Sequence, residues 1–137
     1  MEKLIKFTID KTKKGISPIA NIRGDIEGTP DDFKIKFEAV LDSSFDKYEI
    51  YYHGDDDRIV FKRTGENNLT LCVKWGVMSA VSLSTPYGIV NCFCYGKNIV
   101  ATLDDDMNGD LHFEYEIENS NDGVIRVFLE INPLECE

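Results

Sequence analysis

Hydrophobic and polar residues alternate with a period of two along most of the chain, a pattern typical of β-strands that turn one face toward a core. The clearest case is the segment 111–117, where four apolar side chains alternate with one histidine and two glutamates. The alternation predicts roughly ten or eleven strands with short connections and no helix. These strands are expected over residues 5–9, 18–28, 33–41, 48–53, 58–63, 69–75, 78–85, 89–95, 99–103, 111–117 and 124–131.

Glycine, proline and charged residues separate these segments and predict the turns between them. We expect turns at residues 13–15, 28–32, 54–57, 86–88, 96–98 and 121–123. The segment 89–95 differs from the others because it carries few charges. Such a composition predicts a strand that is covered on both faces.

Composition supports an all-β fold. The chain has 23 isoleucine and valine residues against 9 leucines and 4 alanines, so β-branched residues outnumber strong helix formers. Its 137 residues fit a single domain over residues 1–137. An antiparallel sheet of this size must split into a sandwich or close into a barrel to limit its open edges. Periodicity leaves both architectures open.

Charge excludes two classes of partner. With 15 basic and 25 acidic residues the formal net charge is -10, which repels nucleic acid and anionic membrane surfaces. The first residues lack a signal-peptide pattern, and no run of 18 apolar residues is present. We therefore expect a cytoplasmic protein whose four cysteines are reduced. The sequence predicts no oligomeric state.

One resemblance favours the barrel. The turn Thr85, Pro86, Tyr87, Gly88 is followed by a strand, by residues 99–103, and then by a G-x-L-x-x-x-Y strand that begins at residue 109. This order resembles the bacterial family DUF1934, whose function is unknown. The resemblance implies a single antiparallel, calycin-like (lipocalin-like) β-barrel of roughly eight to eleven strands in the cytoplasm. It carries no established activity and therefore no catalytic residue.

The most conspicuous chemical motif is the acidic segment 104–109, which begins like a calcium loop. Its twelfth position is Tyr115 rather than a bidentate glutamate, and Asn-Gly at 108–109 is a strong hairpin signal. We therefore interpret the segment as a hairpin tip. His53 and His112 lie on polar strand faces, where surface exposure is the default interpretation. No metal ligand set, cofactor motif or catalytic motif is predicted.

Large side chains predicted to point inward either fill the barrel or line a small pocket. The weak candidates for ligand contact are Tyr52, Phe61, Arg63, Trp75, Phe93 and Tyr115, with Trp75 expected in the core or at the barrel rim. Arg63 alternates with Ile59 and Phe61, so an inward guanidinium would need an internal acid or a ligand carboxylate as its partner. Exposure at the strand end is the interpretation that we prefer from the sequence.

Three hypotheses about function follow. The first is a non-enzymatic barrel that binds a small, partly apolar ligand in its interior or mouth. The second is a protein-interaction module that uses an outer sheet face or a strand edge. The third is a small-molecule enzyme without a recognisable motif. We favour the first because of the fold analogy.

Overall fold

The alternating segments form strands in a computed structural model, which describes residues 1–17, 19–41, 44–65, 68–85 and 87–134. Within these residues the chain contains no helix, and in particular none of the length and apolarity that crossing a membrane would require. The strands of the described residues are β1 (Glu2–Lys11), β2 (Gly15–Ile16), β3 (Ala20–Thr29), β4 (Asp32–Leu41), β5 (Ser44–His53), β6 (Arg58–Gly65), β7 (Leu69–Lys74), β8 (Met78–Thr85), β9 (Gly88–Leu103), β10 (Gly109–Ile117) and β11 (Val124–Asn132).

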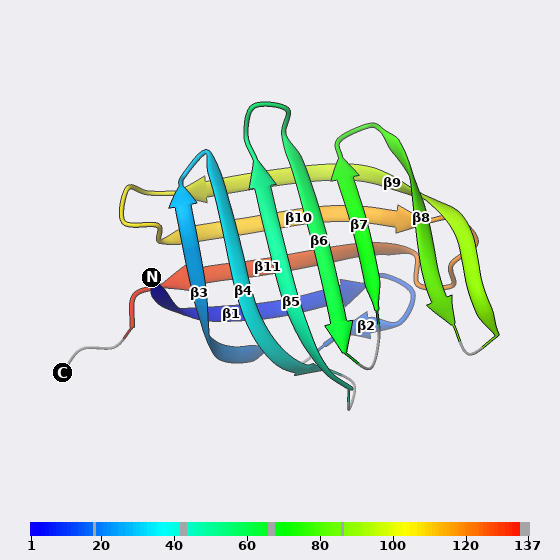
Figure 1. The fold of residues 1–137 in the computed structure, drawn as a ribbon, viewed down its shortest axis with the longest axis horizontal. Coiled ribbons are helices and arrows are strands. Elements are labelled where there is room, and N and C mark those ends of the chain that lie inside the picture. Colours follow the sequence, from blue (N-terminus) through cyan, green and yellow to red (C-terminus); the bar gives the residue numbers. More distant parts are fainter. Residues whose placement is uncertain (18, 42–43, 66–67, 86, 135–137) are drawn as a thin grey trace.

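The strands form one antiparallel sheet that curls into a nearly closed barrel (Figure 1). Its order is β7-β6-β5-β4-β3-β1-β11-β10-β9-β8, and β2 pairs with β1 outside this path. The first and last strands are neighbours, with a register that runs from Leu4 opposite Asn132 to Lys11 opposite Ile125. The predicted all-β barrel is therefore confirmed.

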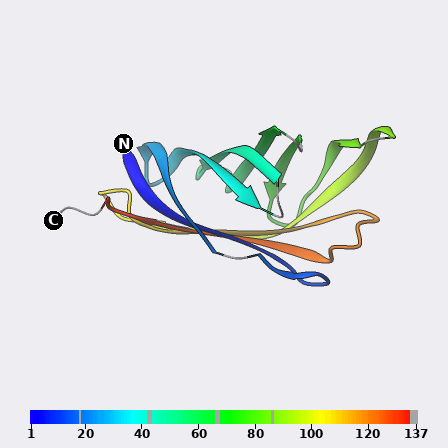
Figure 2. The same cartoon turned by 90° about the horizontal axis from the view of Figure 1, so that it is seen from below.

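Two layers enclose the core. Strands β3 to β7 cross over the layer made by β1, β11, β10 and the second half of β9, and the hairpin of β8 and the first half of β9 flares to one side (Figure 2). Strand β9 belongs to both parts because it pairs first with β8 and then with β10.

The turn predicted at residues 96–98 is wrong, because β9 runs through it without interruption. Glu114 lies opposite Asn98 and Tyr115 lies opposite Gly96, so Lys97 is the extra residue of a β-bulge. Bulges and strand glycines share their sequence signal with turns, and a bulge bends a strand without ending it. Here the bend lets one strand serve both layers.

The barrel closes at Gly96. Trp75 and Gly96 form an isolated bridge, and the amide of Gly76 donates a hydrogen bond of 2.8 Å to the carbonyl of Gly96. A side chain at position 96 would overlap the backbone of Lys74, so the close approach requires glycine. In the described part of the chain no further ladder joins β7 to β8.

Aromatic rings fill the centre of the barrel. The ring of Phe7 lies 4.8 Å from that of Phe37 and 5.0 Å from that of Tyr48, and the rings of Phe61 and Phe113 are 5.6 Å apart. All these side chains are buried. Edge-to-face pairs of this kind add about 0.5–1.5 kcal/mol each beyond the burial of apolar area. These aromatic side chains therefore occupy the space between the two layers.

Candidate functional site

One end of the barrel forms an open mouth. The last residues of β1, β6 and β10 and the first residues of β5, β7 and β11 meet there, together with β2 and the turn between β10 and β11. The N-terminus and the end of β11 lie at the opposite end (Figure 1). Because these elements come from the whole length of the sequence, the mouth exists only in the folded barrel.

Arg63 stands at the centre of this mouth. It lies near the end of β6, opposite Tyr48 of β5 and Leu69 of β7. Its side chain is half-buried, its Nε atom is enclosed without a hydrogen-bond partner, and no ion pair joins it to any other described residue. An enclosed guanidinium nitrogen without a partner carries a desolvation cost of about 1–3 kcal/mol. Of the two predicted positions, the structure therefore favours the inward one.

Two hollows of about 440 Å³ each flank Arg63 and share it as a wall, together with Ile9 and Lys11. Both linings mix polar and apolar groups, with a small excess of polar surface in the first hollow and of apolar surface in the second. The further residues of the first are Lys14, Gly15, Ile16, Ser17, Leu41, Ser44, Asp46 and Tyr48. The second adds the apolar or weakly polar Leu69, Leu83, Val90, Cys92, Tyr115, Ile117 and Ile125 and the polar Asn68, Asn91, Glu118, Asn119, Ser120 and Asp122.

The charges of the mouth are unevenly compensated. Lys14 Nζ lies 2.9 Å from Asp122 Oδ1, and Lys11 Nζ lies 3.8 Å from Asp122 Oδ2, so one carboxylate faces both lysines. The lining of the first hollow has three basic side chains and one acidic side chain, Asp46, which is a formal charge of +2. Glu118 and Asp122 line the second hollow, so over both linings three basic side chains stand against three acidic ones, and the excess of positive charge is confined to the first hollow.

Buried polar groups form one wall of the first hollow. The hydroxyl of Ser44 donates a hydrogen bond of 2.8 Å to Asp46 Oδ2, and Asp46 is almost fully buried. On the other side of Arg63, burial raises the pKa of the Tyr115 hydroxyl, and the positive charge of Arg63 partly offsets that rise. The guanidinium thus lies between a carboxylate wall and a neutral phenol.

The opposite end of the barrel is closed by a second buried cation. Lys3 Nζ donates hydrogen bonds of 2.7 Å to the carbonyl of Asp106 and of 2.7 Å to Asn108 Oδ1. Met107 is buried in the same hairpin tip, with a φ angle of 64°. The predicted hairpin tip at residues 104–109 is confirmed, and an ammonium group already binds the oxygen atoms that a cation would use.

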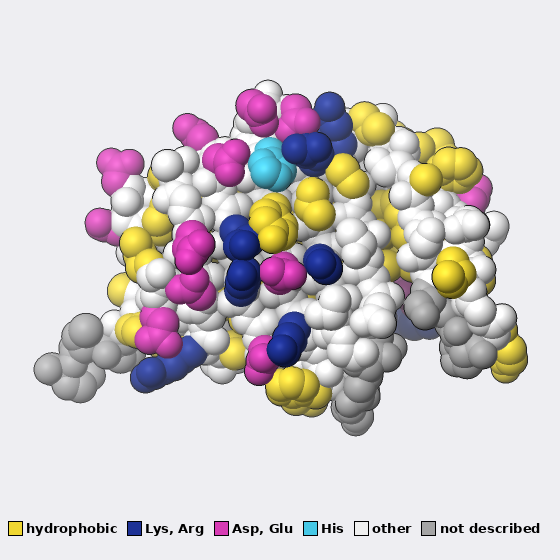
Figure 3. Space-filling view, viewed as in Figure 1, with side chains coloured by type: hydrophobic (Ala, Val, Ile, Leu, Met, Phe, Trp, Pro, Cys, Tyr) yellow, Lys and Arg dark blue, Asp and Glu magenta, His cyan; other side chains and the backbone are white. Residues whose placement is uncertain are grey.

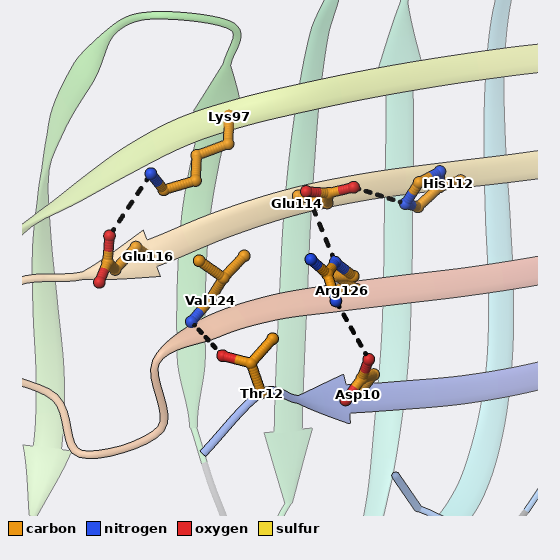
Figure 4. Close-up of polar contacts among 8 residues, drawn as sticks. All are labelled: Asp10, Thr12, Lys97, His112, Glu114, Glu116, Val124 and Arg126. Atoms are coloured by element: carbon orange, nitrogen blue, oxygen red, sulfur yellow. Dashed lines mark hydrogen bonds and ion pairs between the residues drawn. The ribbon is translucent and has the colours of Figure 1, made fainter. Parts of the chain in front are cut away.

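A chain of ion pairs crosses the outer face of the barrel (Figure 4). Arg126 on β11 lies 3.7 Å from Glu114 on β10 and 3.5 Å from Asp10 on β1. The ring of His112 stacks on Phe128 with centroids 4.5 Å apart, and its Nε2 lies 3.1 Å from Glu114 without hydrogen-bond geometry. These contacts connect three adjacent strands, so we interpret them as structural. The surface position predicted for His112 is half-buried instead.

The six candidate ligand residues do not gather at one place. Arg63 and Tyr115 meet at the mouth, and Phe61 lies below them in the aromatic core. Tyr52 is at the opposite end of β5, where its hydroxyl donates a hydrogen bond of 3.3 Å to Asp57.

The inward positions predicted for Phe93 and Trp75 are corrected. Phe93 points outward and is 46% exposed, because the neighbouring Cys94 takes the inward position on β9. Trp75 is 58% exposed, so of its two predicted positions the core is wrong and the barrel rim remains. Residues 89–95 leave one face in the open, so a single chain does not cover both faces of this strand as predicted.

The turn of the family motif lies between paired strands. Thr85 of β8 lies opposite Gly88 of β9, Tyr87 is fully exposed, and Pro86 lies outside the described residues. The predicted hairpin connection is thus confirmed by its flanking strands. Of the motif residues whose side chains the structure describes, Tyr87 and Gly88, neither lines either hollow.

Sequence reasoning missed most of the mouth. Lys11, Lys14, Ser44, Asp46 and Asp122 were assigned to no site, because each is an ordinary polar residue near a strand end. Lys3, by contrast, could have been found. Lys3 lies two residues before Ile5, so alternation places its side chain on the inward face with Ile5, Phe7 and Ile9. A lysine at such a position needs buried oxygen atoms as partners.

The described residues bring together no group of three or more histidine, cysteine, aspartate or glutamate side chains that could hold a metal ion.

Comparison with known proteins adds a family and a fold. No curated protein matches the chain. The crystal structure of the ywiB protein from Bacillus subtilis is similar, with a TM-score of 0.70 at 10% identity over 98% of this chain and 91% of that one. The family model described as a domain of unknown function, DUF1934, matches residues 9–131, and the chain therefore belongs to this family.

Proposed function

We propose that the protein binds a small molecule with a carboxylate and an apolar part in the barrel mouth, with Arg63 as the group that recognises the carboxylate. The observation that carries the proposal is the enclosed Nε atom of Arg63, which has no hydrogen-bond partner. Buried polar groups are almost always satisfied, so an unsatisfied one beside an open hollow points to a ligand. A guanidinium binds a carboxylate through two parallel hydrogen bonds.

The two hollows give the ligand an orientation. The carboxylate belongs in the first hollow, where Arg63 and two lysines stand against a single acidic side chain, Asp46. The apolar part belongs in the second hollow, against Leu69, Leu83 and Ile125. Arg63 lies on the wall that both share, so one ligand can contact it from either side.

Titration with four carboxylates tests the proposal: acetate, octanoate, benzoate and succinate, with octan-1-ol as the neutral analogue of octanoate. Amide chemical shifts report where each compound binds, and calorimetry reports its affinity. We expect octanoate to bind in the mouth more tightly than octan-1-ol. Replacement of Arg63 by methionine should weaken octanoate about ten- to hundredfold, the equivalent of a charged hydrogen bond.

Arg23→Met is the matched control, because Arg23 is exposed on β3 and lines neither hollow of the mouth. This variant should bind octanoate like the original protein, and Arg63→Met should bind octan-1-ol unchanged. The proposal is wrong if no carboxylate shifts the amides around Arg63, or if both variants lose affinity equally. Native mass spectrometry of freshly purified protein would identify a natural ligand by its mass.

A further inference from the structure

The hairpin formed by β8 and the first half of β9 has a composition unlike the rest of the chain. No charged residue occurs from Trp75 to Gly96, although 29% of the chain is charged. Figure 3 shows charged side chains gathered over β3 to β7, while uncharged surface covers the hairpin at the right. A charge-free segment in so acidic a protein requires a physical reason.

The exposed face of this hairpin is uncharged and mostly apolar, with one polar pair, Ser82 and Asn91, in the same rows. Ladder partners place Met78 beside Tyr95 and Ala80 beside Phe93 on the same outer side. We define the hairpin face as Met78, Ala80, Ile89, Phe93 and Tyr95. Their large side chains are between 40% and 73% exposed, and exposed apolar groups in one patch mark interaction surfaces.

The inner face of the same hairpin packs on the core. Val81 and Cys94 are buried there, and Leu83 and Cys92 pack against the core cluster. A strand that is apolar on both faces is the pattern of a strand covered on both sides. The barrel itself covers only the inner face.

We propose that a second copy of this chain covers the hairpin face, so that the protein forms a two-fold symmetric dimer through it. A symmetric interface places a surface against an identical surface. Two chains of net charge -10 repel each other, and most of their surface would bring like charges together. The hairpin face avoids this repulsion because it has no charge.

The border of the face fits the same interpretation. Lys97 follows the charge-free segment, and its Nζ lies 5.2 Å from the centre of the Tyr95 ring and 3.6 Å from Glu116. Within the face the polar pair is neutral, since the hydroxyl of Ser82 donates a hydrogen bond of 2.9 Å to Asn91. An apolar centre with a charged rim is the usual anatomy of a protein interface.

Sedimentation velocity between about 1 and 100 µM tests the proposal over the micromolar affinities that small interfaces reach. We expect a species of twice the 15.6 kDa chain mass, and added salt should not dissociate it. Phe93→Glu should weaken dimerisation about a hundredfold or more, as the loss of a central aromatic anchor does. Phe128→Glu is the matched control, because Phe128 is also an exposed aromatic residue but lies on β11. It should remain a dimer.

Two further measurements separate a lost interface from a lost fold. A mixture of the Phe93→Glu and Phe93→Lys variants should dimerise again, because their opposite charges then attract. Trp75 is the single tryptophan and bridges to Gly96 beside the face, so its emission should shift to shorter wavelength as the protein concentration rises. A monomer at every concentration, or equal dimerisation of the two glutamate variants, would overturn the proposal. A monomer that binds only a different protein would also overturn it.

Discussion

Replacing Arg63 by methionine should stabilise the folded protein, although Arg63 lies on the inner face of the sheet. Methionine keeps the length of the side chain and removes the enclosed nitrogen that lacks a partner. An unsatisfied buried donor costs about 1–3 kcal/mol, and since Arg63 is only half-buried we expect a gain near the lower end, about 1 kcal/mol. With an unfolding entropy of about 2.1 cal/mol/K per residue over 137 residues, the midpoint should rise by about 3–4 °C.

Replacing Lys3 by methionine should have the opposite effect and destabilise the protein. Lys3 is also a cation inside the barrel, but it donates two hydrogen bonds of 2.7 Å to oxygen atoms of the hairpin tip. Its replacement leaves those acceptors unsatisfied and should cost about 2–3 kcal/mol, or about 7–10 °C. Urea unfolding and thermal melts of ligand-free protein measure both changes. A loss of 1 kcal/mol or more in Arg63→Met would refute the reasoning, because it would mean that the guanidinium has a stabilising partner.

Three further predictions concern packing and pH. Gly96→Ala should destabilise the barrel by about 1–3 kcal/mol in urea, because a Cβ would overlap the backbone of Lys74. Burial raises the pKa of the Cys94 thiol from 9.0 to about 12, so its stabilising contribution is complete below pH 9 and is lost as the pH rises toward 12. Alkaline melts should therefore show a shallower decline in Cys94→Ala. Arg126→Met should change the free energy of unfolding by less than about 1 kcal/mol, because its ion pairs are partly solvated.

Alternation in the sequence predicts strands well and predicts their inner face only where one side is polar. In β10 the glutamates mark the outer face, and the inward positions of Phe113 and Tyr115 follow from them. In the first half of β9 both faces are apolar, so alternation does not show which side chains point inward. Phe93 was predicted to point inward because it is large. In the structure the smaller Cys94 points inward instead.

The candidate site was predictable only in part. Arg63 became a candidate because it lies two residues after Phe61, and alternation along a strand places both side chains on the same face. Lys14 and Asp122 are 2.9 Å apart at opposite ends of the sequence, and the pairing of β1 with β11 brings them together. Such long-range pairing depends on the whole topology. No local pattern predicts which strand ends will meet.

The two ends of the barrel differ in a way that assigns them different tasks. At one end Lys3 and Met107 close the barrel with satisfied hydrogen bonds and buried apolar surface. At the other end the fold keeps Arg63 beside two hollows at a cost in stability. A residue that lowers stability persists where it serves another purpose. The contrast between two cations in one barrel therefore supports the proposal that a ligand binds at the Arg63 end.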